Sequence, residues 1–326
     1  MRRFLIGLVV SAASVALLYF ATDWSRTLPV LKRAEVLPIA LAILCLLASL
    51  AAKTVRWRLL LPAGADITMP RLSRIMYISF LLNNVLPARV GDVARVAMTS
   101  RQPGVRVGHV VSSLLTERVA DAAVLVGCFL VISPFLPLPS AYQEWVEYAW
   151  AAALGIAILA ALGFLSRRLI ARTLNAPWVA RRMPAKDWIR LEVASFAEGW
   201  RSLLSPRRLV GVWGWSAAAW AGAFAINYLL MQALDIKAPI TVAILLTCTT
   251  NLAMLIPSSP GYVGVFHAAA TLSLLPFDVS APVALSFAVL AHLVNVLPVS
   301  LLGIAFLLWG RETISLSQKP QQTLPG

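Results

Sequence analysis

The sequence predicts an all-α polytopic membrane protein with about six full transmembrane helices and two opposed re-entrant helical hairpins. Three observations favour this fold class. Of the 326 residues, 60% are apolar and only 13% are charged, whereas a typical soluble domain has about 25% charged residues. Several apolar runs reach the ~20 residues that a membrane-spanning helix needs. The net charge of +14 is unevenly distributed along the chain. These features exclude a soluble globular domain, a disordered chain and a disulfide scaffold.

Six apolar runs are long enough to cross a bilayer. Each is bounded by charged residues, Pro or Trp, and Trp near the ends of a span is typical of membrane interfaces. The predicted spans cover residues 4–22, 36–52, 114–136, 146–165, 208–230 and 282–308. We interpret the first as a retained helix, because the sequence YFATDW over residues 19–24 is a poor signal-peptide cleavage site.

Three further apolar segments, 72–86, 241–256 and 262–275, are too short to span. At 1.5 Å per residue they would reach only about 21–24 Å, whereas the hydrocarbon core is about 30 Å thick. The last two are separated by the helix-breaking sequence PSSPG over 257–261. We therefore expect a helix–break–helix hairpin that enters and leaves on one side. Such broken backbone is tolerated where it is buried in protein or lines a wet cavity.

The basic residues predict that both termini are cytoplasmic. With that orientation, the inner side holds all of the 28 Lys and Arg residues except Arg26, Lys32, Arg33 and Lys237, as the positive-inside rule requires. The stretch 72–92 then enters the membrane from the cytoplasm and the stretch 241–275 from outside. Two facing re-entrant elements resemble the inverted repeats of transporters, whose sites lie near the midplane.

The predicted organisation is a single integral membrane domain over 1–310 and a disordered tail over 311–326. A basic cytoplasmic loop covers about 166–208. Within this loop an apolar helix face recurs at spacings of three and four, formed by Ile189, Val193, Phe196, Trp200 and Leu203. This helix would lie either on an anionic membrane surface or against the base of the protein itself.

The densest polar run, NNVLPARVGDVAR over 83–95, is the first candidate site. Pro87 and Gly91 would break the helix, and Asp92 is suited to cap the helix that follows. Arg89 and Arg95 would lie near a helix N-terminus, which itself attracts anions. Arginine is also the residue expected where a phosphate is held bidentately. These residues therefore predict a phosphate cradle, to which Asn84 adds a neutral donor; ordinary juxtamembrane charges are the alternative.

The second candidate is the sequence ERVAD over 117–121. Glu117 and Asp121 share a helix face, and Arg118 and Asp121 are spaced to pair. Asp121 lies one turn inside an apolar run, where an ionisable group indicates a functional site. Its expected partners are Arg89, Arg95 or Arg118. An interfacial cap that reaches water is the alternative, and a Glu117–Asp121 proton relay is a further one.

The third candidate is the break between the two short apolar segments. Ser259 followed by Pro260 reads as an N-cap and first helical residue, and Ser258 would add a second hydroxyl. Pro257 marks the end of the preceding helix, while Gly261 and Gly264 permit close backbone approach. His267 would lie about two turns into the next helix, where a lone His is more often a packing residue than a proton relay.

No local signature of catalysis or of a bound cofactor is present. The sequence has no Walker, GxGxxG, HExxH or GxSxG motif. Cys45, Cys128 and Cys248 lie far apart inside apolar runs without any CxxC, so neither a disulfide framework nor a zinc site is indicated. We expect no cofactor and no metal. Nucleic-acid binding is disfavoured, because the membrane orientation accounts for most of the basic excess.

These motifs resemble the lysylphosphatidylglycerol synthase transmembrane family, a flippase-like family of integral membrane proteins. The resemblance rests on the run Asn84–Arg95, on Glu117-Arg118 with Asp121, and on Pro257–Gly264, and it covers about residues 4–308. The basic-aromatic stretch KTVRWRLLL over 53–61 is also similar. One departure is His267, because many members place Glu there in a G-V-x-E-A pattern.

The resemblance implies a protein of the bacterial plasma (inner) membrane that moves lipid between leaflets. In two-part members a separate C-terminal domain performs aminoacyl transfer, and we expect no such domain and no enzymatic activity here. The expected substrate is an anionic or phosphate-bearing lipid or glycolipid. Two alternatives stay open. The first is a non-catalytic membrane partner of a glycosyltransferase or other envelope-lipid biosynthetic enzyme. The second is an intramembrane lipid-modifying enzyme that uses Glu117, Asp121 or His267.

Overall fold

The computed structural model describes residues 24–62, 64–86, 89–136, 144, 147–151, 153–155, 191–192, 194–196, 206–254 and 260–309. Helices are the regular structure of these residues, and no strand occurs among them. The all-α fold class is confirmed for this part of the chain. The predicted span 4–22, most of the predicted span 146–165, most of the basic loop and the tail 311–326 lie outside the described residues.

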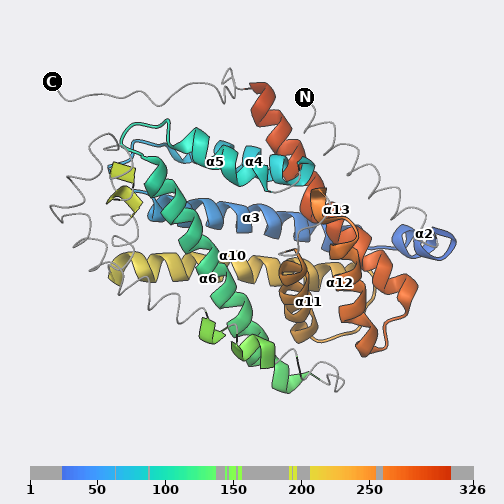
Figure 1. The fold of residues 1–326 in the computed structure, drawn as a ribbon. Helices are drawn as coiled ribbons and strands as arrows, with labels where there is room; N and C mark the ends of the chain where they lie inside the picture. Colours follow the sequence, from blue (N-terminus) through green and yellow to red (C-terminus); the bar gives the residue numbers. More distant parts are fainter. Residues whose placement is uncertain are drawn as a thin grey trace, which may run out of the picture.

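Figure 1 shows the described helices. Their bounds are α2 Trp24–Lys32, α3 Val36–Leu60, α4 Met69–Val85, α5 Val90–Thr99, α6 Val107–Ile132, α10 Pro206–Ala233, α11 Ile240–Ala253, α12 Val265–Leu274 and α13 Ala281–Trp309. Single 3-10 turns follow α6 (η1, Ser133–Phe135), precede α12 (η3, Pro260–Tyr262) and follow α12 (η4, Leu275–Phe277).

Four of the described helices are long and apolar enough to cross a membrane: α3, α6 with its 3-10 extension, α10 and α13. Each coincides with one predicted span to within a residue or contains it. Two of them are longer than their hydropathy indicated, because α3 continues beyond residue 52 to Leu60 and α6 begins at Val107 instead of residue 114. The additional turns of α3 carry Arg56, which pairs with acidic side chains on α6.

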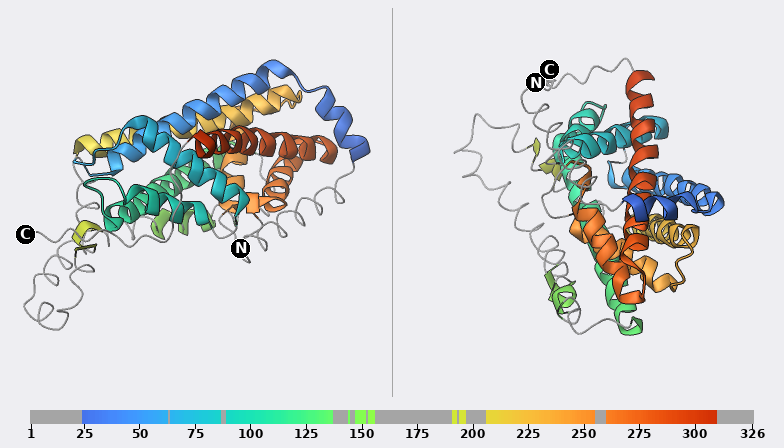
Figure 2. Two further views of the ribbon diagram at one scale, coloured as in Figure 1. Left: turned by 90° about the horizontal axis from the view of Figure 1, so that it is seen from above. Right: turned by 90° about the vertical axis from the view of Figure 1, so that its right-hand side faces the viewer.

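Helices α3 and α10 form an antiparallel pair that runs through the molecule (Figures 1 and 2). The amide of Glu35 donates to the carbonyl of Ala233 at one end of the pair. Near its middle, the Ser49 hydroxyl donates to the carbonyl of Ala219 at 2.8 Å. A Cβ atom at Gly222 would lie 3.3 Å from the carbonyl oxygen of Cys45. Small residues thus let the two backbones approach closely, as is usual between membrane helices.

The predicted hairpin over 241–275 is confirmed as a helix–break–helix unit. Helices α11 and α12 pack against each other, and the hydroxyls of Thr249 and Ser273 lie 2.7 Å apart between them. Gly261 and Gly264 in the break have φ angles of 68° and 90°, which favour glycine. Pro257 lies outside the described residues, and Pro260 begins the 3-10 turn η3.

The first break has a different form from the predicted one. Helix α4 ends at Val85 and α5 begins at Val90, so Gly91 lies inside a helix instead of breaking one. The left-handed residue is Arg89, with φ 53°. Gly91 is needed for packing, because a Cβ there would overlap the carbonyl oxygen of Ser79 on α4. Pro87 lies outside the described residues.

Candidate functional site

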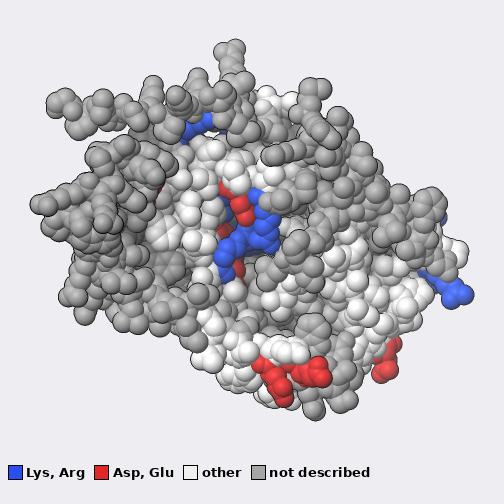
Figure 3. All heavy atoms as spheres, viewed as in Figure 1, with Lys and Arg blue, Asp and Glu red and all other residues white. Residues whose placement is uncertain are grey.

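Charged side chains from three helices meet inside the molecule. We define the charged cluster as Arg56 from α3, Asp92 and Arg95 from α5, and Glu117, Arg118 and Asp121 from α6. The sequence predicted five of these six residues as site residues. Figure 3 shows basic and acidic atoms side by side in a hollow near the middle of one face. Buried ion pairs in a chain this apolar are expensive and indicate function.

Arg56 is the cluster member that sequence reasoning did not single out. Its side chain has no exposed surface, and its Nη1 and Nη2 donate to the two carboxylate oxygens of Asp121 at 2.5 and 3.3 Å. Nη2 also donates to Glu117 Oε1 at 3.1 Å, and Nη1 donates to the hydroxyl of Ser216 on α10 at 3.0 Å. The expected partners of Asp121, which were Arg89, Arg95 or Arg118, are therefore wrong. Hydropathy placed Arg56 in a loop, although α3 continues through it.

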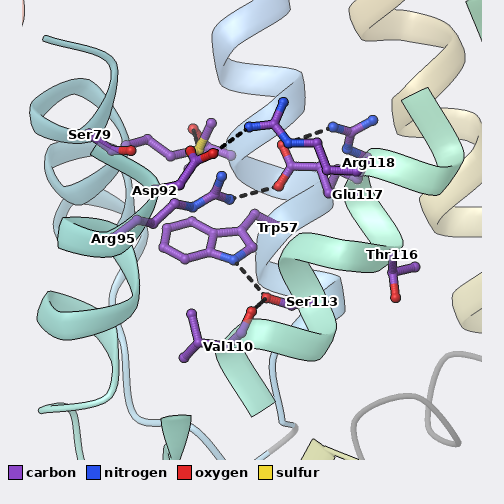
Figure 4. Close-up of polar contacts among 12 residues, drawn as sticks. Trp57, Ser79, Asp92, Arg95, Val110, Ser113, Thr116, Glu117 and Arg118 are labelled. Carbon is purple, nitrogen blue, oxygen red and sulfur yellow. Dashed lines mark hydrogen bonds and ion pairs between the residues drawn. The ribbon is translucent and has the colours of Figure 1, made fainter. Parts of the chain in front are cut away.

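Glu117 joins two arginines through its two carboxylate oxygens (Figure 4). Oε1 accepts from Arg56 and Oε2 accepts from Arg95 Nη2 at 2.9 Å. The Arg95 guanidinium also stacks on the Trp57 ring, 3.7 Å from its centroid. The indole nitrogen of Trp57 in turn donates to Ser113 Oγ at 3.2 Å. The Arg95–Glu117 pair between α5 and α6 thus has further contacts with Trp57 and Arg56 on α3.

The pair Arg118–Asp92 is the open part of the charged cluster. Arg118 Nη2 lies 2.8 Å from Asp92 Oδ2, and the two side chains are 47% and 25% exposed. Asp92 Oδ1 accepts from Asn83 Nδ2 at 3.2 Å. Asp92 was expected to cap α5, but Arg89 occupies the N-cap position and Asp92 lies in the first turn. In the first turn its negative charge interacts favourably with the positive end of the helix dipole. Its carboxylate links α4 to α6, because it accepts from Asn83 on α4 and pairs with Arg118 on α6.

Two further side chains border the charged cluster from α10 and α3. The Trp220 indole donates to Asp121 Oδ1 at 3.1 Å, and the Lys53 ammonium lies over the Trp220 ring at 5.5 Å from its centroid. The signal in the sequence that points to Lys53, Arg56 and Trp57 is the basic-aromatic stretch 53–61, which is part of the resemblance to the family.

The two helix breaks contact each other. Arg89 Nη2 donates to the carbonyl of Met254 at the end of α11, at 3.2 Å. A Cβ atom at Gly261 would lie 3.2 Å from the carbonyl oxygen of Asn84. The Asn84 amide itself donates to Ser300 Oγ on α13 at 3.1 Å. Opposed hairpins require such an approach of the two breaks.

The third candidate site is the break between α11 and α12, with His267 after it. Ser258 and Ser259 lie outside the described residues, and α12 begins only at Val265 with Gly264 as its N-cap. His267 is therefore in the first turn and not two turns into the helix. Its Nδ1 accepts from the Gly264 amide at 3.4 Å, and its ring packs against His292 with a centroid distance of 4.8 Å. These contacts are those of a packed capping histidine.

A described fragment of the basic loop packs against the protein. The amide of Gly108 in the first turn of α6 donates to the Glu192 carboxylate at 2.6 Å. A Cβ atom at Gly108 would lie 2.8 Å from the backbone nitrogen of Phe196. Of the predicted apolar helix face, Phe196 is among the described residues, whereas Ile189, Val193, Trp200 and Leu203 lie outside them. Leu191 and Ala194 of the fragment are exposed.

The described part of the chain contains neither a cluster of metal-ligating side chains nor a disulfide. Within the described part of the chain, no group of three or more His, Cys, Asp and Glu side chains is arranged to hold a metal ion. The three cysteines carry free thiols, and Cys248 Sγ donates to the carbonyl of Leu125 at 3.4 Å.

Comparison with known proteins gives the family. One similar protein is the glycosyltransferase AglD of Haloferax volcanii, which is 26% identical over 321 residues. That alignment covers 89% of this chain and 51% of the relative, so the chain spans about half the length of that protein. The profile of the family described as "Lysylphosphatidylglycerol synthase TM region" matches residues 4–303. This match covers nearly the whole chain, and the protein belongs to that family of membrane domains.

Proposed function

We propose that the protein moves a lipid with an anionic or phosphate-bearing headgroup between the leaflets of the membrane. The observation that carries the proposal is the half-exposed Arg118 guanidinium. It lies next to the buried ion pairs that Glu117 forms with Arg56 and Arg95, in a chain with four helices long and apolar enough to cross a membrane. The headgroup would bind at Arg118 while its acyl chains stay in the bilayer. The family membership supports a role in lipid or glycolipid handling.

The proposed topology has cytoplasmic termini, about six spans and two opposed re-entrant hairpins in a bacterial plasma membrane. Support comes from the distribution of basic residues and from the contact of the two breaks at Asn84 and Gly261. In this orientation the hairpin α4–α5 enters from the cytoplasm and the hairpin α11–α12 from outside. The charged cluster then lies on the cytoplasmic side of that contact.

The cluster residues divide into two roles in this proposal. Arg56, Arg95 and Glu117 are nearly inaccessible, and Glu117 pairs with both arginines, so they act as positioning residues. Within the described part of the chain, Arg118 and Arg89 each donate one side-chain hydrogen bond, whereas a guanidinium has five N–H donors, so they can receive a phosphate. Arg89 is held in the left-handed region, which is uncommon for a non-glycine residue and is found at functional sites.

Lipid transfer in reconstituted vesicles tests the proposal. Vesicles that contain the full chain should move a fluorescent phospholipid analogue to the inner leaflet, where dithionite does not bleach it. Arg118→Gln and Arg89→Gln should each reduce the rate about tenfold or more, since one charge-assisted hydrogen bond contributes ~1.5–3 kcal/mol. Arg207→Gln, which changes an exposed arginine at the start of α10, is the matched control. Transfer at the wild-type rate by a folded Arg118→Gln protein contradicts the proposal.

A second candidate function is a membrane partner of a glycosyltransferase. It is favoured by the similarity to half of a protein named as a glycosyltransferase, together with the packed loop fragment at Glu192, which would form a docking surface. In this case an enzyme should co-purify with the chain and be lost on deletion of 186–204. The purified chain should then show no lipid transfer.

A further inference from the structure

Two ion pairs of opposite polarity join α5 to α6. In the inner pair the cation is on α5, because Arg95 binds Glu117. In the outer pair the cation is on α6, because Arg118 binds Asp92. The inner pair is almost completely covered, with 3% and 9% exposure, while the outer pair is 47% and 25% exposed. Only the outer pair is therefore within reach of a ligand.

The outer pair is also the weaker of the two. Arg95 and Glu117 have additional partners in Trp57 and Arg56, and separating a buried pair leaves uncompensated charges. Among the residues that the structure describes, the Arg118 side chain donates one hydrogen bond, to Asp92. Pairs as exposed as this one contribute little stability. An incoming anion can thus compete for Arg118 without disturbing the buried network.

We infer that the carboxylate of Asp92 occupies, in the ligand-free protein, the place on Arg118 that a phosphate takes when ligand binds. This inference rests on the proposed function and adds the mode of binding and the class of ligand. Arg118 has four N–H donors left, which suits the bidentate binding of phosphate. Asp92 keeps its hydrogen bond from Asn83 when it leaves Arg118.

The exchange explains why an acidic residue lies in a site for anions. Without ligand, Asp92 neutralises the half-exposed Arg118 guanidinium. A phosphate that replaces it keeps Arg118 neutralised. Because a phosphomonoester carries a charge of about −1.5 to −2 at neutral pH, it should displace a carboxylate better than a singly charged phosphodiester does. The favoured ligand class is therefore an amphiphile with a terminal phosphate.

Binding to the purified full chain in detergent tests the exchange without any transfer step. The probes are dihexanoyl phosphatidic acid, inorganic phosphate and uncharged dihexanoylglycerol, measured by titration calorimetry. Asp92→Asn should bind phosphatidic acid about fivefold more tightly, because it removes the internal competitor. Arg118→Gln should bind it at least tenfold more weakly, and the double variant should show no gain over Arg118→Gln. Asp278→Asn, which removes an exposed carboxylate elsewhere, should bind as the wild type does.

The competing outcomes are distinct. Unchanged or weaker binding by a folded Asp92→Asn protein overturns the exchange, as does a gain that persists in the double variant or a wild type that binds no phosphate probe. If Asp92→Asn does not fold, Asp92→Ser replaces it in the same test. Tighter binding of phosphatidic acid than of inorganic phosphate assigns the site to a lipid, and equal binding assigns it to free phosphate. Binding with exchange but without vesicle transfer contradicts the proposed function alone.

Discussion

At the residue scale, Glu117 holds the charged cluster together. Its two carboxylate oxygens bind Arg56 and Arg95, which come from different helices. Both arginines are buried, and each has additional partners that depend on its position, Asp121 for Arg56 and Trp57 for Arg95. A carboxylate between two guanidinium groups reduces the cost of burying either one. Glu117 is therefore a structural requirement for the site as well as part of it.

Removing the charge of Glu117 should destabilise the protein strongly. In Glu117→Gln the Arg95 guanidinium loses its carboxylate partner in a buried setting, and Arg56 loses one of two. Breaking a buried pair costs about 3–5 kcal/mol, so we expect a clear fall in the midpoint of thermal unfolding in detergent. The matched control is Glu147→Gln, at an exposed glutamate, which should unfold at the wild-type temperature. Equal midpoints for Glu117→Gln and the wild type would contradict the buried network.

The residues of the site were more predictable than their partners. Local sequence revealed Asp92 because it lies in the densest polar run, and Glu117 and Asp121 because charge at an apolar run is conspicuous. Their pairing could not be read in the same way. The partner of Asp121 is Arg56, 65 residues away, and hydropathy had ended its helix before it. From sequence alone, an arginine whose partner is on a distant helix cannot be distinguished from an arginine in a solvent-exposed loop.

At the element scale, the crossing of α13 and α4 depends on Gly303. A Cβ atom at this position would lie 2.8 Å from the carbonyl oxygen of Tyr77 and 2.7 Å from Leu81 Cβ. Both contacts are too close for real atoms, and the oxygen belongs to helix backbone that cannot shift alone. Since Asn84 on α4 also bonds Ser300 on α13, this crossing sets where the first helix break lies.

Gly303→Ala should therefore separate α13 from α4. Overpacking of this kind costs about 1–3 kcal/mol, more than the ~0.5–1 kcal/mol that alanine gains over glycine in a helix. Thermal unfolding should show a lower midpoint for Gly303→Ala. Gly127→Ala on α6, where a Cβ atom would meet no neighbour within 4 Å, should leave the midpoint unchanged or raise it. Equal behaviour of the two variants would exclude the close crossing.

The elements differ in how well sequence predicts them. The α11–α12 hairpin is encoded locally, because two prolines and a glycine within five residues, PSSPG over 257–261, interrupt a helix. The start of α5 is not encoded in this way. It follows a left-handed arginine, Arg89, and Gly91 is needed for contact with Ser79 on α4 and not for a turn. The sequence alone does not distinguish a glycine that allows close helix packing from a glycine that allows a turn.

At the scale of the whole molecule, the antiparallel α3–α10 pair has two ends that can be named by their contacts. Glu35 contacts Ala233 at one end, and Gly211 packs near Leu59 at the other. The charged cluster lies towards this second end, because Arg56 is on the last turns of α3 and contacts Ser216 on α10. The proposed orientation therefore places Lys237 outside and Arg101 inside.

Labelling of single cysteines in intact cells tests this orientation. In a variant whose three native cysteines are replaced by alanine, Lys237→Cys should react with a membrane-impermeant maleimide. Arg101→Cys should react only after the membrane is made permeable. Both positions are exposed in the structure, so a difference between them reports the side of the membrane. The reverse pattern would show the opposite orientation and move the charged cluster to the outer side.

The position of Arg56 also has a consequence for how the chain enters the membrane during synthesis. Its carboxylate partners are made 61 and 65 residues later, and Ser216 is made 160 residues later. Until α6 follows, the last turns of α3 carry cations that hydrocarbon does not accept. Arg56 therefore obtains its partners on α6 and α10 only after these later helices have been synthesised.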